Sequence, residues 1–170
     1  MRFAELYETH YRRVYGLCRR LLGAADRAED AAQETFLRAH QALHRYDPSQ
    51  PFGPWIMSIA TRHCVDLLRR RAKERALFGS EETERLGLEE DRATVLGGLL
   101  VEEQAERLRN AIAALPDRYR VPLVLAYYDD ASYDEIAAAL GITRTHVGVL
   151  INRAKQALRR ALPPEGRNRE

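Results

Sequence analysis

The chain of 170 residues has two cysteines, one tryptophan and no apolar run approaching the length of a membrane span. Cys18 and Cys64 lie far apart, and no Cys or His cluster has metal-ligand spacing. We therefore expect buried free thiols, no metal and no cofactor. The first residues carry scattered charge and lack the apolar core of a signal peptide. These absences predict a cytoplasmic protein without membrane insertion.

Motifs for catalysis are also missing. Neither Gly-rich phosphate-binding pattern, GxxxxGK[ST] or GxGxxG, occurs in the chain. No Ser, Cys or His lies in a recognisable nucleophile motif. The sequence therefore favours a protein that is not an enzyme and has no small-molecule substrate.

Charge is distributed in blocks of opposite sign. Residues 1–75 hold 14 Lys or Arg against 9 Asp or Glu, residues 76–104 hold 2 against 8, and residues 105–170 hold 11 against 8. Two basic blocks flanking an acidic one predict two modules that face nucleic acid and a linker that does not. The acidic stretch has four glycines and no sustained periodicity, as flexible linkers do. The predicted divisions are a domain over 1–75, a linker over 76–100, a domain over 101–163 and a polar tail over 164–170.

Apolar residues at helical spacing predict three helices in the first domain, over 3–22, over 27–44 and from Pro54 to about Arg75. Asp26 and Glu29 have the spacing of a capping box for the second helix. The segment YDPSQPFGP before the third helix has three prolines and a glycine, which predict a loop that carries aromatic residues.

The third helix ends in LLRRRAKER, with five cations in seven residues. Like charges at this density repel one another unless a polyanion lies nearby. A basic helix next to an aromatic loop is a combination that binds single-stranded nucleic acid through phosphates and stacked bases. The alternative is a solvated helix end with favourable dipole placement.

The second domain is predicted to contain four helices, with an awkward Pro122 inside the second of them. Its last two helices have the pattern of a helix-turn-helix. Ser132 and Glu135 form a capping box, Gly141 suits a left-handed turn, and Thr143 suits an N-cap. In such a motif the second helix enters the major groove of DNA. An ordinary helical hairpin is the alternative. The predicted fold class is all-α, with two small helical domains.

Four stretches together resemble the bacterial extracytoplasmic-function (ECF) sigma factors, which contain only sigma regions 2 and 4. They are AEDAAQETFLRAH over 28–40, FGPWIMSIATRHCVDLLRRR over 52–71, LPDRYRVPLVLAYYDDASYDEIAAALGI over 115–142 and NRAKQALRR over 152–160. The resemblance implies a transcription initiation factor that binds core RNA polymerase, recognises the −10 and −35 elements of promoter DNA and promotes melting. It also implies an anti-sigma factor as a possible partner.

The same resemblance assigns roles to three groups of residues. Core polymerase binding falls to Asp30, Gln33, Glu34, Phe36, Leu37 and Arg38. Recognition and melting of the −10 element fall to Tyr46, Phe52, Trp55, Arg62, Arg69, Arg70 and Arg71. Binding of the −35 element falls to Arg144, Thr145, His146, Gly148, Val149, Asn152, Arg153 and Lys155.

The recognition helix departs from the family pattern. Gly148 and Val149 stand where relatives usually have groups that contact the groove, so we expect a −35 sequence that differs from the commonest one. Two other classes of protein remain as alternatives. A stand-alone helix-turn-helix regulator would bind duplex DNA tightly without polymerase, and an RNA-binding protein using the basic helix would bind RNA without polymerase.

Overall fold

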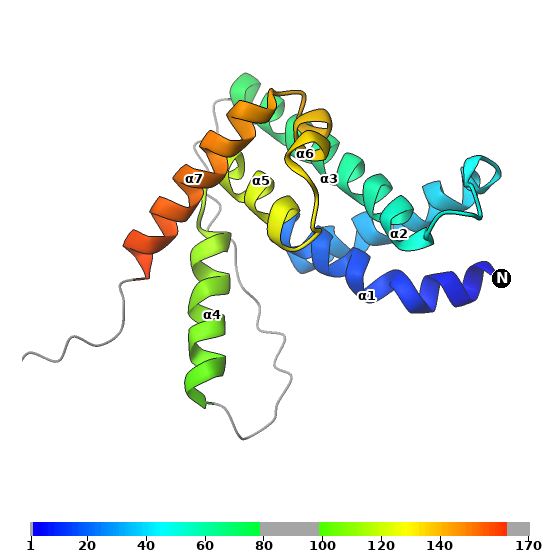
Figure 1. The fold of residues 1–170 in the computed structure, drawn as a ribbon, viewed down its shortest axis with the longest axis horizontal. Helices are drawn as coiled ribbons and strands as arrows, with labels where there is room; N and C mark the ends of the chain where they lie inside the picture. Colours follow the sequence, from blue (N-terminus) through cyan, green and yellow to red (C-terminus); the bar gives the residue numbers. More distant parts are fainter. Residues whose placement is uncertain (1, 79–98, 163–170) are drawn as a thin grey trace, which may run out of the picture.

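The computed structural model describes residues 2–78 and 99–162, and all regular structure in these ranges is helical (Figure 1). The predicted all-α class is confirmed. Most of the predicted linker, over 79–98, and the predicted tail lie outside the described residues. The elements are α1 (Phe3–Leu22), α2 (Ala25–Gln41), the 3-10 turn η1 (Leu43–Arg45), α3 (Phe52–Phe78), α4 (Leu99–Ala113), α5 (Asp117–Tyr127), α6 (Tyr133–Leu140) and α7 (Arg144–Ala161).

Helices α1, α2 and α3 form the first packed unit, because each buries one apolar stripe against the other two. The stripe of α2 consists largely of alanines, which let the neighbouring helices approach closely. Cys18 and Cys64 face each other in this core as free thiols, with their sulfur atoms 3.6 Å apart. The thiol–thiol hydrogen bond and the burial raise the pKa of Cys64, so both cysteines act as core side chains.

The start of α2 differs from the prediction. The helix begins at Ala25, its N-cap is Ala24, and no side chain caps it. The capping box expected from Asp26 and Glu29 is therefore wrong. Asp26 lies inside the first turn, where its carboxylate accepts the N–H of Arg27 at 2.8 Å and its charge favours the positive end of the helix dipole.

Helix α3 also begins earlier than expected, at Phe52. Pro54 therefore lies in the first helical turn, where its missing N–H breaks no helical hydrogen bond. Phe52 becomes part of the core, with 6% of its surface exposed. The described helix extends three residues past the predicted boundary at 75, and the described part of α4 begins at Leu99.

Helix α5 is the centre of the second unit. It is buried on nearly every side, from Arg120 through Leu125, because it contacts α1, α6 and α7. Pro122 lies within the helix and is fully buried. The helix continues through this proline, which packs as an apolar residue. The helix is therefore not broken at Pro122, where the sequence predicted an irregularity, and the proline is accommodated as a buried residue.

The helix-turn-helix of α6 and α7 forms as the sequence predicts. Ser132 accepts the N–H of Glu135 at 3.2 Å, and the Glu135 carboxylate accepts the N–H of Ser132 at 2.7 Å. Gly141 ends α6 with φ of 68°, a left-handed value that favours glycine. Thr143 caps α7 by accepting the N–H of His146 at 3.2 Å. These residues fix the angle between α6 and α7.

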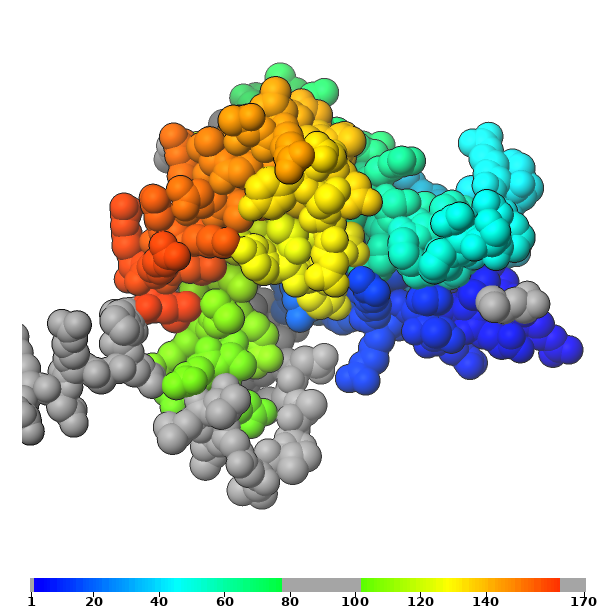
Figure 2. Space-filling view, viewed as in Figure 1, coloured from blue at the N-terminus to red at the C-terminus, as the bar shows by residue number. Residues whose placement is uncertain are grey.

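The two units pack against each other. Helix α5 lies against α1, and α6 lies against α3, so the buried apolar residues of both units form one continuous cluster. In Figure 1 the golden α6 lies beside α3, and in Figure 2 the surfaces of the two units meet. Helix α4 projects away and packs on α7. The sequence made no prediction about this arrangement.

Candidate nucleic-acid interface

The arginines of α3 lie along its exposed side and toward its C-terminal end. Arg62, Arg69 and Arg70 are exposed, and Arg71 is half-buried. Arg69 is held by two groups. One Nη atom donates to the backbone oxygen of Leu140 at 2.8 Å, and the other lies 3.8 Å from the carboxylate of Asp66. The predicted cationic surface is present, with one of its arginines bonded to α6.

The aromatic residues of the predicted loop form a cluster at the other end of α3. The Tyr46 ring lies 4.9 Å from Trp55 and 5.4 Å from Phe52, measured between ring centroids. The Tyr46 hydroxyl donates to the backbone oxygen of Gln50. Tyr46 and Trp55 are half-buried, whereas Phe52 is buried. Phe52 therefore anchors the loop, and the two other rings remain partly accessible.

Asp47 and His10 support this loop. The Asp47 carboxylate accepts the N–H and the hydroxyl of Ser49 at 2.9 and 2.8 Å, and these bonds lower its pKa. His10 on α1 lies 5.3 Å from the Phe52 ring. Burial, with a smaller contribution from Arg13, lowers the pKa of His10, so the ring is neutral against the aromatic cluster near neutral pH. The loop is thus ordered by its own hydrogen bonds and by α1.

The outer face of α2 displays an apolar side chain among charges. Leu37 is 52% exposed. Arg38 donates to Glu34 at 2.7 Å, and this hydrogen bond lowers the pKa of Glu34. Asp30 and Gln33 are also exposed. Phe36 differs from the other predicted docking residues, because it is 3% exposed and packs against the rings of α1.

The exposed face of α7 starts with Arg144, Thr145 and His146. Arg144 lies 3.4 Å from the carboxylate of Asp134 on α6. Farther along, Val149 is 41% exposed, and Asn152 and Arg153 are exposed. The Lys155 ammonium lies 5.0 Å from the centre of the Tyr127 ring. The predicted residues therefore share one helix with a polar start and an apolar middle.

Gly148 lies beside Tyr133 of α6. A Cβ added at this glycine would meet the Tyr133 ring at 3.7 Å, which is ordinary van der Waals contact. The glycine is therefore not required by the packing of α6 on α7. Its effect is to remove a side chain from the middle of the helix that would enter the groove.

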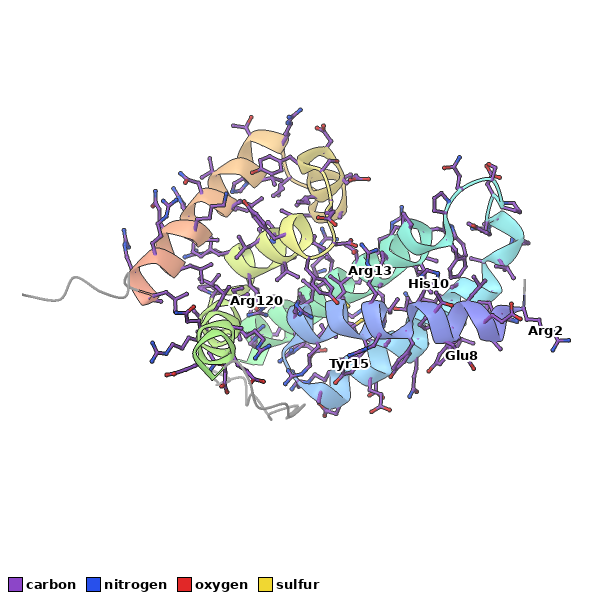
Figure 3. All side chains as sticks on the ribbon, turned by 60° about the horizontal axis from the view of Figure 1, so that its bottom comes forward. Arg2, Glu8, His10, Arg13, Tyr15 and Arg120 are labelled. Atoms are coloured by element: carbon purple, nitrogen blue, oxygen red, sulfur yellow. The ribbon has the colours of Figure 1, made fainter. Side chains whose placement is uncertain are left out.

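Several residues at the contact between the units were missed by sequence reasoning. Arg13 lies 3.9 Å from Asp129, and Arg120, which is 4% exposed, donates to the backbone oxygen of Leu21 at 3.1 Å. Figure 3 labels Arg13 on α1 and Arg120 on α5. The sequence signal that could have identified Arg120 is its place in the apolar segment RVPLVL. Burial, with repulsion by Asp130 and Glu135, raises the pKa of Asp129 to about 6 against the opposing effect of Arg13.

Within residues 2–78 and 99–162, no three His, Cys, Asp or Glu side chains gather closely enough to hold a metal ion. None of the described helices combines the length and the apolar character that crossing a bilayer needs. The exposed arginines of α3 suit binding to an extended anionic polymer, and the exposed Leu37 suits contact with a protein surface.

Comparisons with known proteins agree with this arrangement. Residues 6–74 match the family model Sigma-70 region 2, and residues 105–158 match Sigma-70, region 4. The chain is 34% identical over 166 residues to the ECF RNA polymerase sigma factor SigW of Bacillus subtilis (strain 168), covering 94% of this chain and 88% of that protein. It is 30% identical over 170 residues to SigM of the same organism, covering the full length of both.

Two solved structures share the fold. The sigma factor RpoE of Bartonella quintana, in complex with the anti-sigma factor NepR, matches with a TM-score of 0.66 and 18% identity, covering 96% of this chain and 98% of that one. CnrH, in complex with the cytosolic domain of CnrY, matches with a TM-score of 0.59 and 24% identity, covering 96% of this chain and 89% of that one.

Proposed function

Because the chain belongs to the ECF sigma factors of the sigma-70 family, we propose that its promoter-binding and polymerase-binding roles fall to the surfaces described above. The protein is a transcription initiation factor and not an enzyme. Its partner is core RNA polymerase, and its regions 2 and 4 recognise the −10 and −35 promoter elements. We assign region 2 to the domain predicted over 1–75 and region 4 to the domain predicted over 101–163.

Core polymerase docks on the outer face of α2. The support is Leu37, a large apolar side chain 52% exposed and surrounded by the charged or polar Asp30, Gln33 and Arg38. An apolar residue with a polar rim is the arrangement of a protein–protein contact centre. Glu34 orients Arg38 through their hydrogen bond. Phe36 is buried beneath this surface and supports it by holding α2 against α1.

The −10 element is captured and opened by the loop and basic side of α3. Tyr46 and Trp55 offer partly accessible rings to unstacked bases, while Phe52 keeps the loop in place. Arg62, Arg70 and Arg71, joined by Arg69 when it is released from α6, bind the phosphates. A base that leaves the stack loses a few kcal/mol unless aromatic rings or hydrogen bonds receive it.

The −35 element is read by α7 in the major groove. Arg144, Thr145 and His146 reach base edges at the helix start, and the Asn152 amide suits an adenine edge. Gly148 and Val149 make an apolar middle that suits a thymine methyl group. Arg153 and Lys155 bind phosphates or polymerase. An anti-sigma factor as a further partner stays a prediction.

The observation that carries this proposal is that one helix, α3, joins the aromatic loop at its start to the arginines along its length. A stand-alone regulator would use α6 and α7 and leave that combination without a role. Run-off transcription with purified core polymerase separates the three classes of protein. Only a sigma factor makes transcription depend on both the core polymerase and this chain. Tight binding to duplex DNA alone would favour a regulator, and polymerase-independent RNA binding would favour an RNA-binding protein.

The melting role of α3 is tested by the double variant Arg62→Ala/Arg70→Ala, which leaves Arg69 in place. We expect lower permanganate reactivity at the −10 element with unchanged binding to core polymerase. Arg12→Ala on α1, which also removes an exposed arginine, is the matched control. Wild-type melting by the double variant would contradict the assignment.

A further inference from the structure

The first turn of α6 borders the exposed face of α7 at two places. The Tyr133 ring lies beside Gly148, where a Cβ added at the glycine would meet the Cε2 atom of the ring at 3.7 Å. One turn earlier on α7, the Arg144 guanidinium lies 3.4 Å from the carboxylate of Asp134. Positions four residues apart share one edge of a helix. The edge of α7 that carries Arg144 and Gly148 therefore runs along the start of α6.

Gly148 leaves the Tyr133 ring uncovered beside the face of α7 that points away from the core. The buried residues of α7 are Val147, Leu150, Ile151 and Ala154. Helical geometry therefore turns Val149 directly outward and sets Gly148 at the edge of this outer face, next to α6. Tyr133 is 38% exposed and Val149 is 41% exposed. Since a glycine lies between them, no intervening side chain covers the ring, and apolar surface continues from α7 onto α6.

The hairpin itself does not depend on this tyrosine. Ile136 is fully buried and holds α6 in the core. The reciprocal hydrogen bonds of Ser132 and Glu135 fix the start of the helix, and Gly141 ends it. A large aromatic ring that is more than one-third exposed is therefore available for contact with a ligand.

Charge next to the ring favours a base over a phosphate as that ligand. The Asp134 side chain is 72% exposed. Its carboxylate repels a phosphate that approaches the start of α6. The aromatic ring of Tyr133 has no such conflict with a base edge. Thymine is the base that presents an apolar group, its 5-methyl, in the major groove.

We propose that Tyr133 is a specificity-determining residue for the −35 element, whose ring contacts a thymine 5-methyl group through the gap at Gly148. The recognition surface is then composite, with α6 supplying a base contact at the point where α7 has no side chain. Asp134 acts as a positioning residue, because it holds Arg144 at the same edge of α7. This inference rests on the proposed function, since it requires α7 to lie in the major groove.

Binding-site selection tests the role of the ring. Holoenzyme assembled from core polymerase and the full chain selects promoter fragments from a library that is randomised over the −35 element. We expect the wild type to select a thymine at one position where Tyr133→Ala has no preference, with the other positions unchanged. Tyr133→Phe retains the ring and should retain the thymine. Leu108→Ala removes an exposed apolar side chain from α4 and is the control that should select as the wild type does.

Deoxyuridine in place of the selected thymine isolates the methyl group, because the two bases differ only there. Wild-type holoenzyme should bind the substituted promoter about fourfold more weakly, as expected for one buried methyl group. Tyr133→Ala should bind the two promoters equally. Circular dichroism verifies that the variant keeps its helices.

The outcomes are distinct. A thymine preference that persists in Tyr133→Ala would overturn the proposal. Loss of the preference in both Tyr133→Ala and Tyr133→Phe would also overturn it, because the hydroxyl would then read the base. An equal loss of affinity for every sequence would indicate a phosphate contact and would likewise contradict base reading by the ring. A wild-type holoenzyme that selects no −35 sequence would contradict the proposed function, and base reading by Tyr133 with it.

Discussion

Ser132 and Glu135 each satisfy a backbone N–H that the first turn of α6 leaves without a helical partner. Ser132→Ala should therefore lower the free energy of unfolding of region 4 by about 1 kcal/mol. Ser132→Asp retains an acceptor at the cap and should stay close to wild type. Urea unfolding followed by circular dichroism measures both. Equal midpoints for the alanine and aspartate variants would show that the cap contributes nothing.

Leu37 gives a second test at the scale of one residue. Because its side chain is half exposed, Leu37→Ala should change the free energy of unfolding by less than about 0.5 kcal/mol. The same variant should weaken binding to core polymerase by about 1 kcal/mol or more if Leu37 is the centre of the contact. Leu77→Ala removes an equally large and more exposed side chain and is the matched control. Equal binding by both variants, measured by titration, would remove Leu37 from the interface.

At the scale of helices, local chemistry explains which elements could be predicted. The ends of α6 and the start of α7 followed from Ser132, Gly141 and Thr143, because each makes a contact within a few residues of itself. The start of α2 did not follow, since Asp26 has the residue type of a cap but lies within the first turn. Phe52 was assigned to the loop and to −10 recognition, because the loop pattern does not reveal its burial against His10 and Trp55.

The recognition helix provides a prediction at the same scale. Gly148→Lys should be accommodated, since a Cβ there meets Tyr133 at an ordinary contact distance, and α7 should gain up to about 1 kcal/mol of helix stability. A new lysine in the groove should raise affinity for duplex −35 DNA and increase the slope of log affinity against log salt by about 1. Fluorescence anisotropy across a salt series measures the slope. Gly148→Ala separates the helix effect from the charge, and a slope equal for both variants would place this position away from DNA.

At the scale of the whole molecule, sequence patterns had no information about the contact between the domains. Arg69 was identified as a cation of α3, but its hydrogen bond to Leu140 joins residues 71 positions apart. Gly16 had no apparent role within α1, because the side chain that requires it, Tyr128, belongs to the other domain. Contacts of this kind depend on tertiary packing. A single sequence therefore indicates which residues can form such contacts but not which residues they contact.

Asp129 makes the packing of the two domains against each other depend on pH. Burial raises its pKa to about 6, whereas an exposed aspartate titrates near 3.9. The packed arrangement therefore holds this proton more tightly than separated domains do. By linkage, acid favours the packed arrangement of the two domains. Its free energy weakens by up to about 1.4 kcal/mol per pH unit as the pH rises from about 4 to 6, and it does not change further above about pH 6. The groups that act on Asp129 are Arg13 and Thr61, which lower its pKa, and Asp130 and Glu135, which raise it.

Scattering at pH 7 and pH 5 tests this dependence, and the more compact form is expected at pH 5. Asp129→Asn carries no charge at either pH, so it should be compact at both and lack the transition. This variant also separates Asp129 from His10 and His63, whose burial lowers their pKa and which still titrate in the variant. Compaction at pH 5 that persists in Asp129→Asn would contradict the role of Asp129, whereas loosening at pH 5 would assign the pH dependence to the histidines. In that case acid would act by charging buried imidazoles in region 2 and would loosen the protein, because desolvation opposes the charged ring.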